Sequence, residues 1–116
     1  MLREFVELPE FLKKWEELGL NDEDLKELEN YLCKYPDKGA LVQGTGGLRK
    51  LRWKLGEKGK SGGIRTLYAD FVLYEKLYLI TVYAKHEKDN IRVSEKKAIK
   101  KLLEALEAEL ERKRHG

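Results

Sequence analysis

Residues 44–68, GTGGLRKLRWKLGEKGKSGGIRTLY, place the strongest constraint on the fold of this chain. Two runs in which apolar and basic side chains interleave, LRKLRWKL and IRTLY, are separated by a glycine-rich segment. Short runs of this kind, bounded by glycines, are typical of β-strands joined by a turn. We therefore predict an antiparallel hairpin here, and the rest of the chain has to supply the remainder of a sheet and its cover.

The same stretch concentrates positive charge. It holds seven lysines and arginines against one acid, whereas the whole protein has a formal net charge of only +3. Cations that merely solubilise a hairpin are the ordinary explanation for such a run. Here they coincide with glycines, which let main-chain N–H groups approach an anion, and with Trp53 and Tyr68, which suit stacking on bases. We expect the hairpin to face a nucleic acid.

Two other kinds of site are disfavoured by the pattern. Gly59-Lys60-Ser61 resembles the end of a nucleotide-binding P-loop, but residue 54 is Lys instead of the required Gly, and a strand follows instead of a helix. No Cys or His residues have metal-ligand spacing, and no acidic pair is placed to hold Mg²⁺ beside the hairpin. The sequence therefore predicts neither a metal nor a cofactor.

The N-terminal part of the chain predicts one short strand and two helices. Residues 2–8 alternate as a strand does, and Pro9 fits the first turn of a helix that ends at Gly19. Asn21 caps a second helix, which Pro36 ends. The buried face of this second helix is expected to contain Leu25, Leu28, Tyr31, Leu32 and Tyr35.

Three extended segments predict an antiparallel meander in the middle of the chain. They cover residues 48–55, 64–75 and 77–85, and the last two are expected to join at Glu75 and Lys76. Alternation directs Arg65 to the face where Arg52 or Lys54 could meet it, and the register that decides between them is left open. Ser94 then caps a C-terminal helix. The predicted fold is α+β, with a small antiparallel sheet packed against two N-terminal helices and one C-terminal helix.

Length and composition indicate one domain over residues 1–116. No apolar run approaches the ~20 residues of a membrane helix, and the amino terminus lacks the apolar centre of a signal peptide. The lone Cys33 cannot form an internal disulfide, which agrees with a reducing compartment. We expect a cytoplasmic protein without membrane contact.

The strings GTGGLRKLRW, GKSGGIRTLY and YAKHEKDN, in this order and between these helices, resemble the RelE/HigB superfamily of toxins from bacterial type II toxin–antitoxin systems. The resemblance runs nearly end to end and is strongest to the HigB-like branch. It implies a RelE-like fold and a small endoribonuclease that cleaves mRNA in the ribosomal A site. It also implies a cognate antitoxin, expected to be a small helix-turn-helix protein, that holds the toxin inactive.

The resemblance also assigns roles to residues of the hairpin and of the last strand. Arg65, expected on a polar strand face, resembles the family's transition-state arginine, and Lys50 and Arg52 resemble paired basic positions of the preceding strand. Lys85 resembles the basic residue after the last strand, and His86 stands where better-known RelE members have arginine. The expected catalytic set is Arg65, Arg52, Lys50 and Lys85, and the expected RNA contacts are Arg49, Lys54, Lys60, Tyr68, His86 and Lys88.

RNA cleavage needs three functions that side chains can supply. The 2′-OH must be activated, the developing oxyanion needs hydrogen-bond donors, and the leaving 5′-oxygen needs a proton. The cations favour electrostatic stabilisation as the main contribution, while the general base and the general acid stay open. The alternative function is a non-catalytic RNA- or ribosome-binding module, which would bind translating ribosomes without cutting their mRNA.

Overall fold

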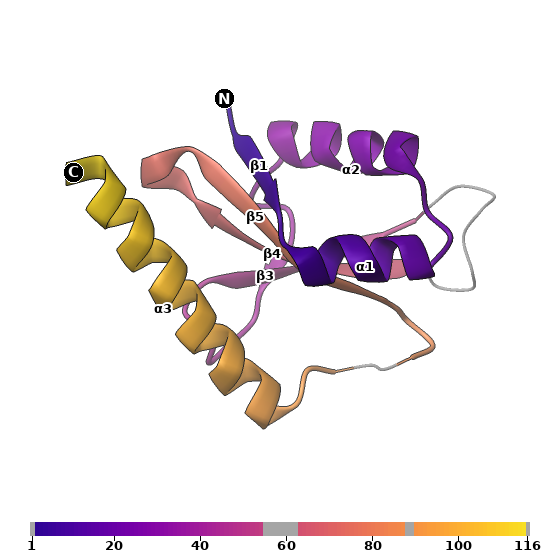
Figure 1. The fold of residues 1–116 in the computed structure, drawn as a ribbon. Helices are drawn as coiled ribbons and strands as arrows, with labels where there is room; N and C mark the ends of the chain where they lie inside the picture. The colour runs from indigo at the N-terminus through magenta and orange to yellow at the C-terminus, as the bar shows by residue number, and fades with distance from the viewer. Residues whose placement is uncertain (1, 55–62, 88–89, 116) are drawn as a thin grey trace.

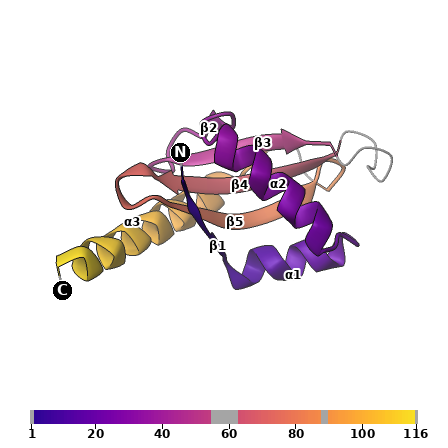
Figure 2. The ribbon, with the colours of Figure 1, turned by 90° about the horizontal axis from the view of Figure 1, so that it is seen from above.

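The structure is a computed structural model that describes residues 2–54, 63–87 and 90–115. Its elements in chain order are β1 (Glu4–Glu7), α1 (Pro9–Glu17), α2 (Asp22–Lys34), β2 (Ala40–Leu41), β3 (Leu48–Trp53), β4 (Ile64–Phe71), β5 (Lys76–Ala84) and α3 (Val93–His115). The strands form one five-stranded sheet in the order β1-β5-β4-β3-β2 (Figure 2). All neighbours are antiparallel except β1, which pairs with β5 in parallel. The expected α+β fold is confirmed, with the addition of the short edge strand β2.

The sheet separates two apolar clusters. Helices α1 and α2 cover one face and α3 packs on the other (Figure 1). The alternation predicted for β4 is confirmed, because Ile64 and Tyr68 belong to the cluster under α1 and α2, whereas Leu67 and Ala69 belong to the cluster under α3. Each side chain of β4 is therefore assigned to one of two distinct environments.

Local sequence signals account for the starts of the first two helices. Pro9 occupies the first turn of α1, where its missing N–H has no intrahelical partner to lose. Asn21 caps α2 through a reciprocal pair of bonds, in which its side chain accepts the Asp24 N–H at 2.9 Å and the Asp24 carboxylate accepts the Asn21 N–H at 3.0 Å. Tyr35 lies beyond the last residue of α2 and is 50% exposed, so its expected place on the buried face was wrong.

The connection between β4 and β5 differs from the prediction. Strand β4 ends at Phe71, a 3-10 turn follows at Val72–Tyr74, and Lys76 already begins β5. Glu75 adopts a left-handed conformation with a φ of 54° and donates its N–H to the Val72 oxygen at 3.1 Å. The β-branched and aromatic side chains of residues 71–74 favour an extended strand, which is why a longer β4 was predicted. The chain instead reverses direction through this tight turn.

Candidate nucleic-acid interface

The centre of the candidate site is a row of side chains across three neighbouring strands. In the sheet register, Arg65 of β4 lies between Arg52 of β3 and Tyr83 of β5. Leu67 and Tyr83 belong to the cluster under α3, and alternate residues of a strand point to the same face. The side chains of Arg52 and Arg65 therefore share the sheet face on which α3 packs, and the register selects Arg52 over Lys54 as the residue opposite Arg65.

Arg65 is more buried than the sequence suggested. We expected a polar strand face, but its exposed fraction is only 7%, whereas Arg52 is exposed. An Nη1 hydrogen of Arg65 is donated to the main-chain oxygen of Ile64 at 3.3 Å. Like charges directly opposite each other on neighbouring strands are destabilising, and an anion bound to both guanidinium groups would offset that repulsion. This cross-strand pair is therefore suited to phosphate.

Four further predicted residues lie near this row. Lys50 is half-buried and precedes Arg52 on the same face of β3. Lys54 follows the last residue of β3 and Lys85 follows the last residue of β5, and both are exposed. Since β3 ends where β5 ends in the register, these two lysines lie at one end of the sheet, with the exposed His86 directly after Lys85. The structure thus gathers most of the predicted cations at this end.

Arg49 and Tyr68 lie on the opposite face. The burial of Tyr68 contradicts the RNA contact expected of it, whereas the contact expected of the half-buried Arg49 stays a prediction. The Arg49 guanidinium donates from Nη1 to the main-chain oxygens of Asp37 at 3.0 Å and Gly39 at 2.7 Å. Tyr68 is fully buried, donates its hydroxyl hydrogen to the Pro36 oxygen at 2.8 Å and accepts the Gly39 N–H at 2.9 Å. Burial raises the pKa of the Tyr68 hydroxyl. Both side chains hold the segment after α2 against the sheet.

Trp53 also lies outside the row. It is half-buried against the cluster under α1 and α2, with its ring centroid 4.9 Å from that of Tyr31. Alternation directs both this ring and that of Tyr68 away from Arg65. The base-stacking role expected for the fully buried Tyr68 is wrong, whereas that of Trp53 stays a prediction. Lys60 and Lys88, two of the expected RNA contacts, lie outside the described residues.

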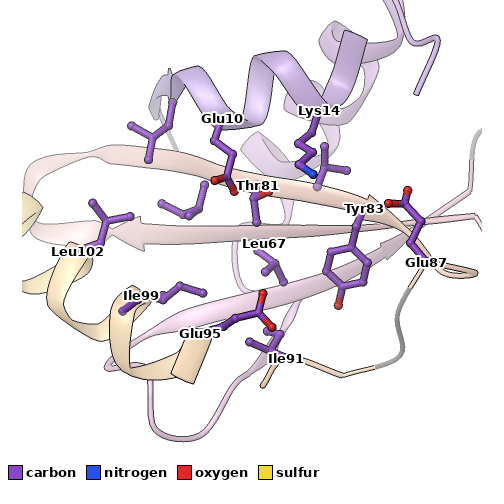
Figure 3. Close-up of a pocket in the computed structure, with 14 residues that line it drawn as sticks. Glu10, Lys14, Leu67, Thr81, Tyr83, Glu87, Ile91, Glu95, Ile99 and Leu102 are labelled. Atoms are coloured by element: carbon purple, nitrogen blue, oxygen red, sulfur yellow. The ribbon is translucent and has the colours of Figure 1, made fainter. Parts of the chain in front are cut away.

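A groove of about 530 Å³ borders the row on its β5 side, between α1, β5 and α3 (Figure 3). Tyr83 lines it, and its rim carries the carboxylates of Glu10, Glu87 and Glu95 against the one amine of Lys14. Its apolar lining includes Leu8, Leu67, Ile80, Ile91, Ile99 and Leu102. An excess of carboxylates repels a polyanion, so the groove marks the edge of the cationic site next to β5. The sequence did not reveal it, because its walls come from segments far apart in the chain.

The sequence also left four lysines of α3 without a role. Lys96, Lys97, Lys100 and Lys101 fall in the first half of the helix, where Glu95 is the one acid before Glu104. The spacing of four residues between Lys96 and Lys100 was a readable signal, since it places both on one helix face. The sequence does not show which part of the fold this helix face contacts.

Neither a metal site nor a membrane span was found in the part of the chain that the structure describes. Within residues 2–54, 63–87 and 90–115, no three His, Cys, Asp or Glu side chains are grouped so as to hold a metal ion. Over the same ranges, no helix has the length and apolar character needed to cross a membrane.

The fold and the row define a class of small α+β domain whose sheet presents paired arginines beside further cations. Residues 10–114 match the protein family described as the RelE toxin of the RelE/RelB toxin–antitoxin system. The chain therefore belongs to the RelE toxin family and is a toxin of a toxin–antitoxin system.

A solved structure supports the same fold. The chain is similar to an arginine-to-alanine double mutant of the E. coli toxin RelE in the free state, with a TM-score of 0.56 and 18% sequence identity. The match covers 77% of this chain and 90% of that chain. This likeness confirms the RelE-like fold, whereas the activity has to be argued from the site.

Proposed function

We propose that this toxin is a ribosome-dependent endoribonuclease of the HigB-like branch, one that cuts mRNA in the ribosomal A site and thereby stops translation in the cytoplasm. The whole chain acts as one toxin domain. The observation that carries the proposal is the register of Arg52 opposite Arg65 in a chain of the RelE family. Cations directly opposite each other on neighbouring strands repel, and a bound phosphate would offset that repulsion while accepting hydrogen bonds from both.

The geometry supports an electrostatic mechanism. Arg65 lies on the middle strand of a three-strand row, and its planar fork can donate two hydrogen bonds to the non-bridging oxygens of the scissile phosphate. Arg52 adds a second guanidinium to the oxyanion that develops when the 2′-OH attacks. Lys50 and Lys85 flank the arginines and are the candidates for taking the proton from the 2′-OH and giving one to the 5′-oxygen. This division needs no metal and no cofactor.

The RNA path is proposed to cross the end of the sheet where β3 and β5 end. Lys54 and His86 are exposed there and can contact phosphates next to the scissile one. Lys60 and Lys88 remain proposed contacts on the resemblance alone. Arg49 and Tyr68 are omitted because their polar groups bind main-chain atoms on the far face.

Substitution of Arg65 tests the mechanism. Arg65→Ala is expected to lower the single-turnover rate of mRNA cleavage on programmed ribosomes by at least ~10²-fold, the scale of losing one oxyanion donor. Arg65→Lys should recover only part of the rate, since a point charge replaces the fork. The matched control is Arg112→Ala on α3, because the Arg112 side chain is 76% exposed and pairs with Glu109 at 3.9 Å.

Because Arg65 is buried, each variant needs its own unfolding curve. A folded Arg65→Ala protein that cuts mRNA at the wild-type rate refutes the assignment. A wild-type protein that binds ribosomes and cuts no mRNA supports the alternative, a non-catalytic ribosome-binding module.

Membership of the family implies an antitoxin of the RelB type. We propose that the cognate antitoxin is a small helix-turn-helix protein whose bound segment covers the cationic face around Arg52 and Arg65. Adding it should abolish cleavage and protect the Arg52 region from modification by an arginine-specific reagent. Full cleavage by the purified complex would contradict neutralisation.

A further inference from the structure

The turn between β2 and β3 is a glycine-rich structure that the proposed mechanism does not use. Gly44, Gly46 and Gly47 have φ angles of 81°, 74° and 127°, which favour glycine over residues with a side chain. The hydroxyl of the buried Thr45 closes the turn by donating to the Val42 oxygen at 2.6 Å and accepting the Leu48 N–H at 3.1 Å. The two backbone ends are therefore held together by a side chain from inside the turn.

Two lysines of α3 lie along this turn. A Cβ added to Gly44 would lie 3.9 Å from Cδ of Lys96, and one added to Gly46 would lie 3.8 Å from Cγ of Lys100. Figure 1 shows the segment between β2 and β3 beside the first half of α3. The aliphatic stems of the lysines therefore pack next to the glycines, and their flexible ends can bring the ammonium groups to an anion bound at the turn.

These lysines are not neutralised locally. Among the described residues, Lys96, Lys97, Lys100 and Lys101 make no ion pair with an acid. Within the same described part of the chain, the N–H groups of Gly46 and Gly47 take part in no turn or loop hydrogen bond. Main-chain N–H groups of successive turn residues form concave sites for anions, and a lysine supplies the point charge.

We propose that the turn Gly44–Gly47, together with Lys96 and Lys100, binds a backbone phosphate of the RNA, as a second anchor separate from the scissile phosphate. This inference rests on the proposed function. Gly47 leads directly into β3, and Arg52 is the fifth residue after it, which corresponds to about 17 Å of extended chain. At the ~3.4 Å spacing of stacked nucleotides, the anchor would hold a phosphate up to about five nucleotides from the cleavage site.

The chemistry favours a phosphate backbone over an apolar partner. The site offers hydrogen-bond donors and two lysines, and β3 leads from it to Lys50 and Arg52, whose side chains share one face of the sheet. The carboxylate-rimmed groove beside β5 lies on the other side of α3 and offers the opposite charge. On one side of the scissile phosphate the RNA is expected to pass Lys54 and His86, and on the other side it is expected to run back along β3 to the glycine turn.

The experiment compares two double variants with the same change of charge. Lys96→Gln with Lys100→Gln removes the ammonium groups at the turn, and Lys97→Gln with Lys101→Gln removes two exposed ones from the same helix. The probe is a single-stranded DNA oligonucleotide, which lacks the 2′-OH and cannot be cleaved. Affinity is measured over a salt series, with an unfolding curve for each variant and with Lys96→Arg and Lys100→Arg as charge-retaining controls.

We expect the first pair to lower affinity about 10-fold and to reduce the salt slope by about 0.7, because one phosphate would no longer be neutralised. The second pair should change affinity less than threefold, and the arginine variants should bind as the wild type does. Equal reductions in both lysine pairs would overturn the inference in favour of diffuse charge. An effect on antitoxin affinity alone would overturn it in favour of a protein partner at this turn. Cleavage of mRNA by the wild-type protein is measured in parallel. If the wild type cuts mRNA, either of these outcomes overturns the phosphate anchor alone and leaves the proposed function intact.

Discussion

Tyr68→Phe tests whether Tyr68 has a structural role in place of the RNA contact expected from the sequence. Its hydroxyl is the one atom removed, and it joins β4 to the segment after α2 through Pro36 and Gly39. The ring stays, so the fully buried site keeps its packing. The variant therefore isolates two hydrogen bonds.

The expected cost follows from those two bonds. Each contributes about 1 kcal/mol, and the buried Gly39 N–H would then be left without this partner, which adds to the penalty. We expect a decrease in stability of about 2–4 kcal/mol, a large part of the ~5–15 kcal/mol that stabilises a domain. For a domain of this size, this is a fall in Tm of roughly 10 °C.

The assay is thermal and urea unfolding followed by circular dichroism, with affinity for single-stranded DNA measured below Tm. Tyr74→Phe is the matched control, because its hydroxyl bonds Glu111 on the exposed surface, where water can replace it, and its removal should leave Tm nearly unchanged. The structural role is refuted if Tyr68→Phe has the same Tm as the wild type and binds single-stranded DNA more weakly.

Three further predictions concern stability. Burial and a hydrogen bond with Glu7 raise the pKa of Glu29 to about 8 from 4.5, so the stability contributed by protonated Glu29 is full below about pH 4.5 and is lost as pH rises through about 8. Glu29→Gln should therefore flatten the pH dependence of the free energy of unfolding in urea between about pH 5 and pH 9, and a variant whose stability still falls as steeply as that of the wild type would contradict this. Thr66→Val should stabilise by about 1 kcal/mol in the same assay, because no described residue bonds the buried Thr66 hydroxyl, and destabilisation would argue against an unpaired hydroxyl. Asp70→Ala should cost about 2–3 kcal/mol, since it removes two charge-assisted hydrogen bonds, which join Asp70 to Arg3 at 2.6 Å and 3.1 Å. A change under about 1 kcal/mol would show that the pair is dispensable.

Local patterns were sufficient wherever the deciding interaction is short-range. Pro9 and Asn21 start their helices through groups within one helical turn, so their roles could be read directly. Alternation along β4 likewise separates Ile64 from Arg65, since neighbouring residues of a strand always face opposite sides. The α+β class and the meander followed from these signals, whereas the choice of Arg52 as the residue opposite Arg65 needed the register.

Only the tertiary structure decided which of the two faces belongs to the candidate site. Arg49 and Lys50 are neighbours with the same charge, yet Arg49 turns toward the segment after α2 and Lys50 toward the face of Arg65. The register of β3 against β4 makes that choice, and a shift of one residue would exchange the two. The parallel pairing of β1 with β5 and the acid-rimmed groove also depend on contacts between distant segments.

The lysines of α3 show the same limit most clearly. Their spacing on the helix was determined by the sequence alone, because it depends only on the helical repeat. These lysines follow Gly44 and Gly46 by some fifty residues in the chain. They lie beside the glycines because α3 packs across the sheet. Charge and periodicity are properties of a segment and can be read from it, whereas a site belongs to the surfaces that folding brings together.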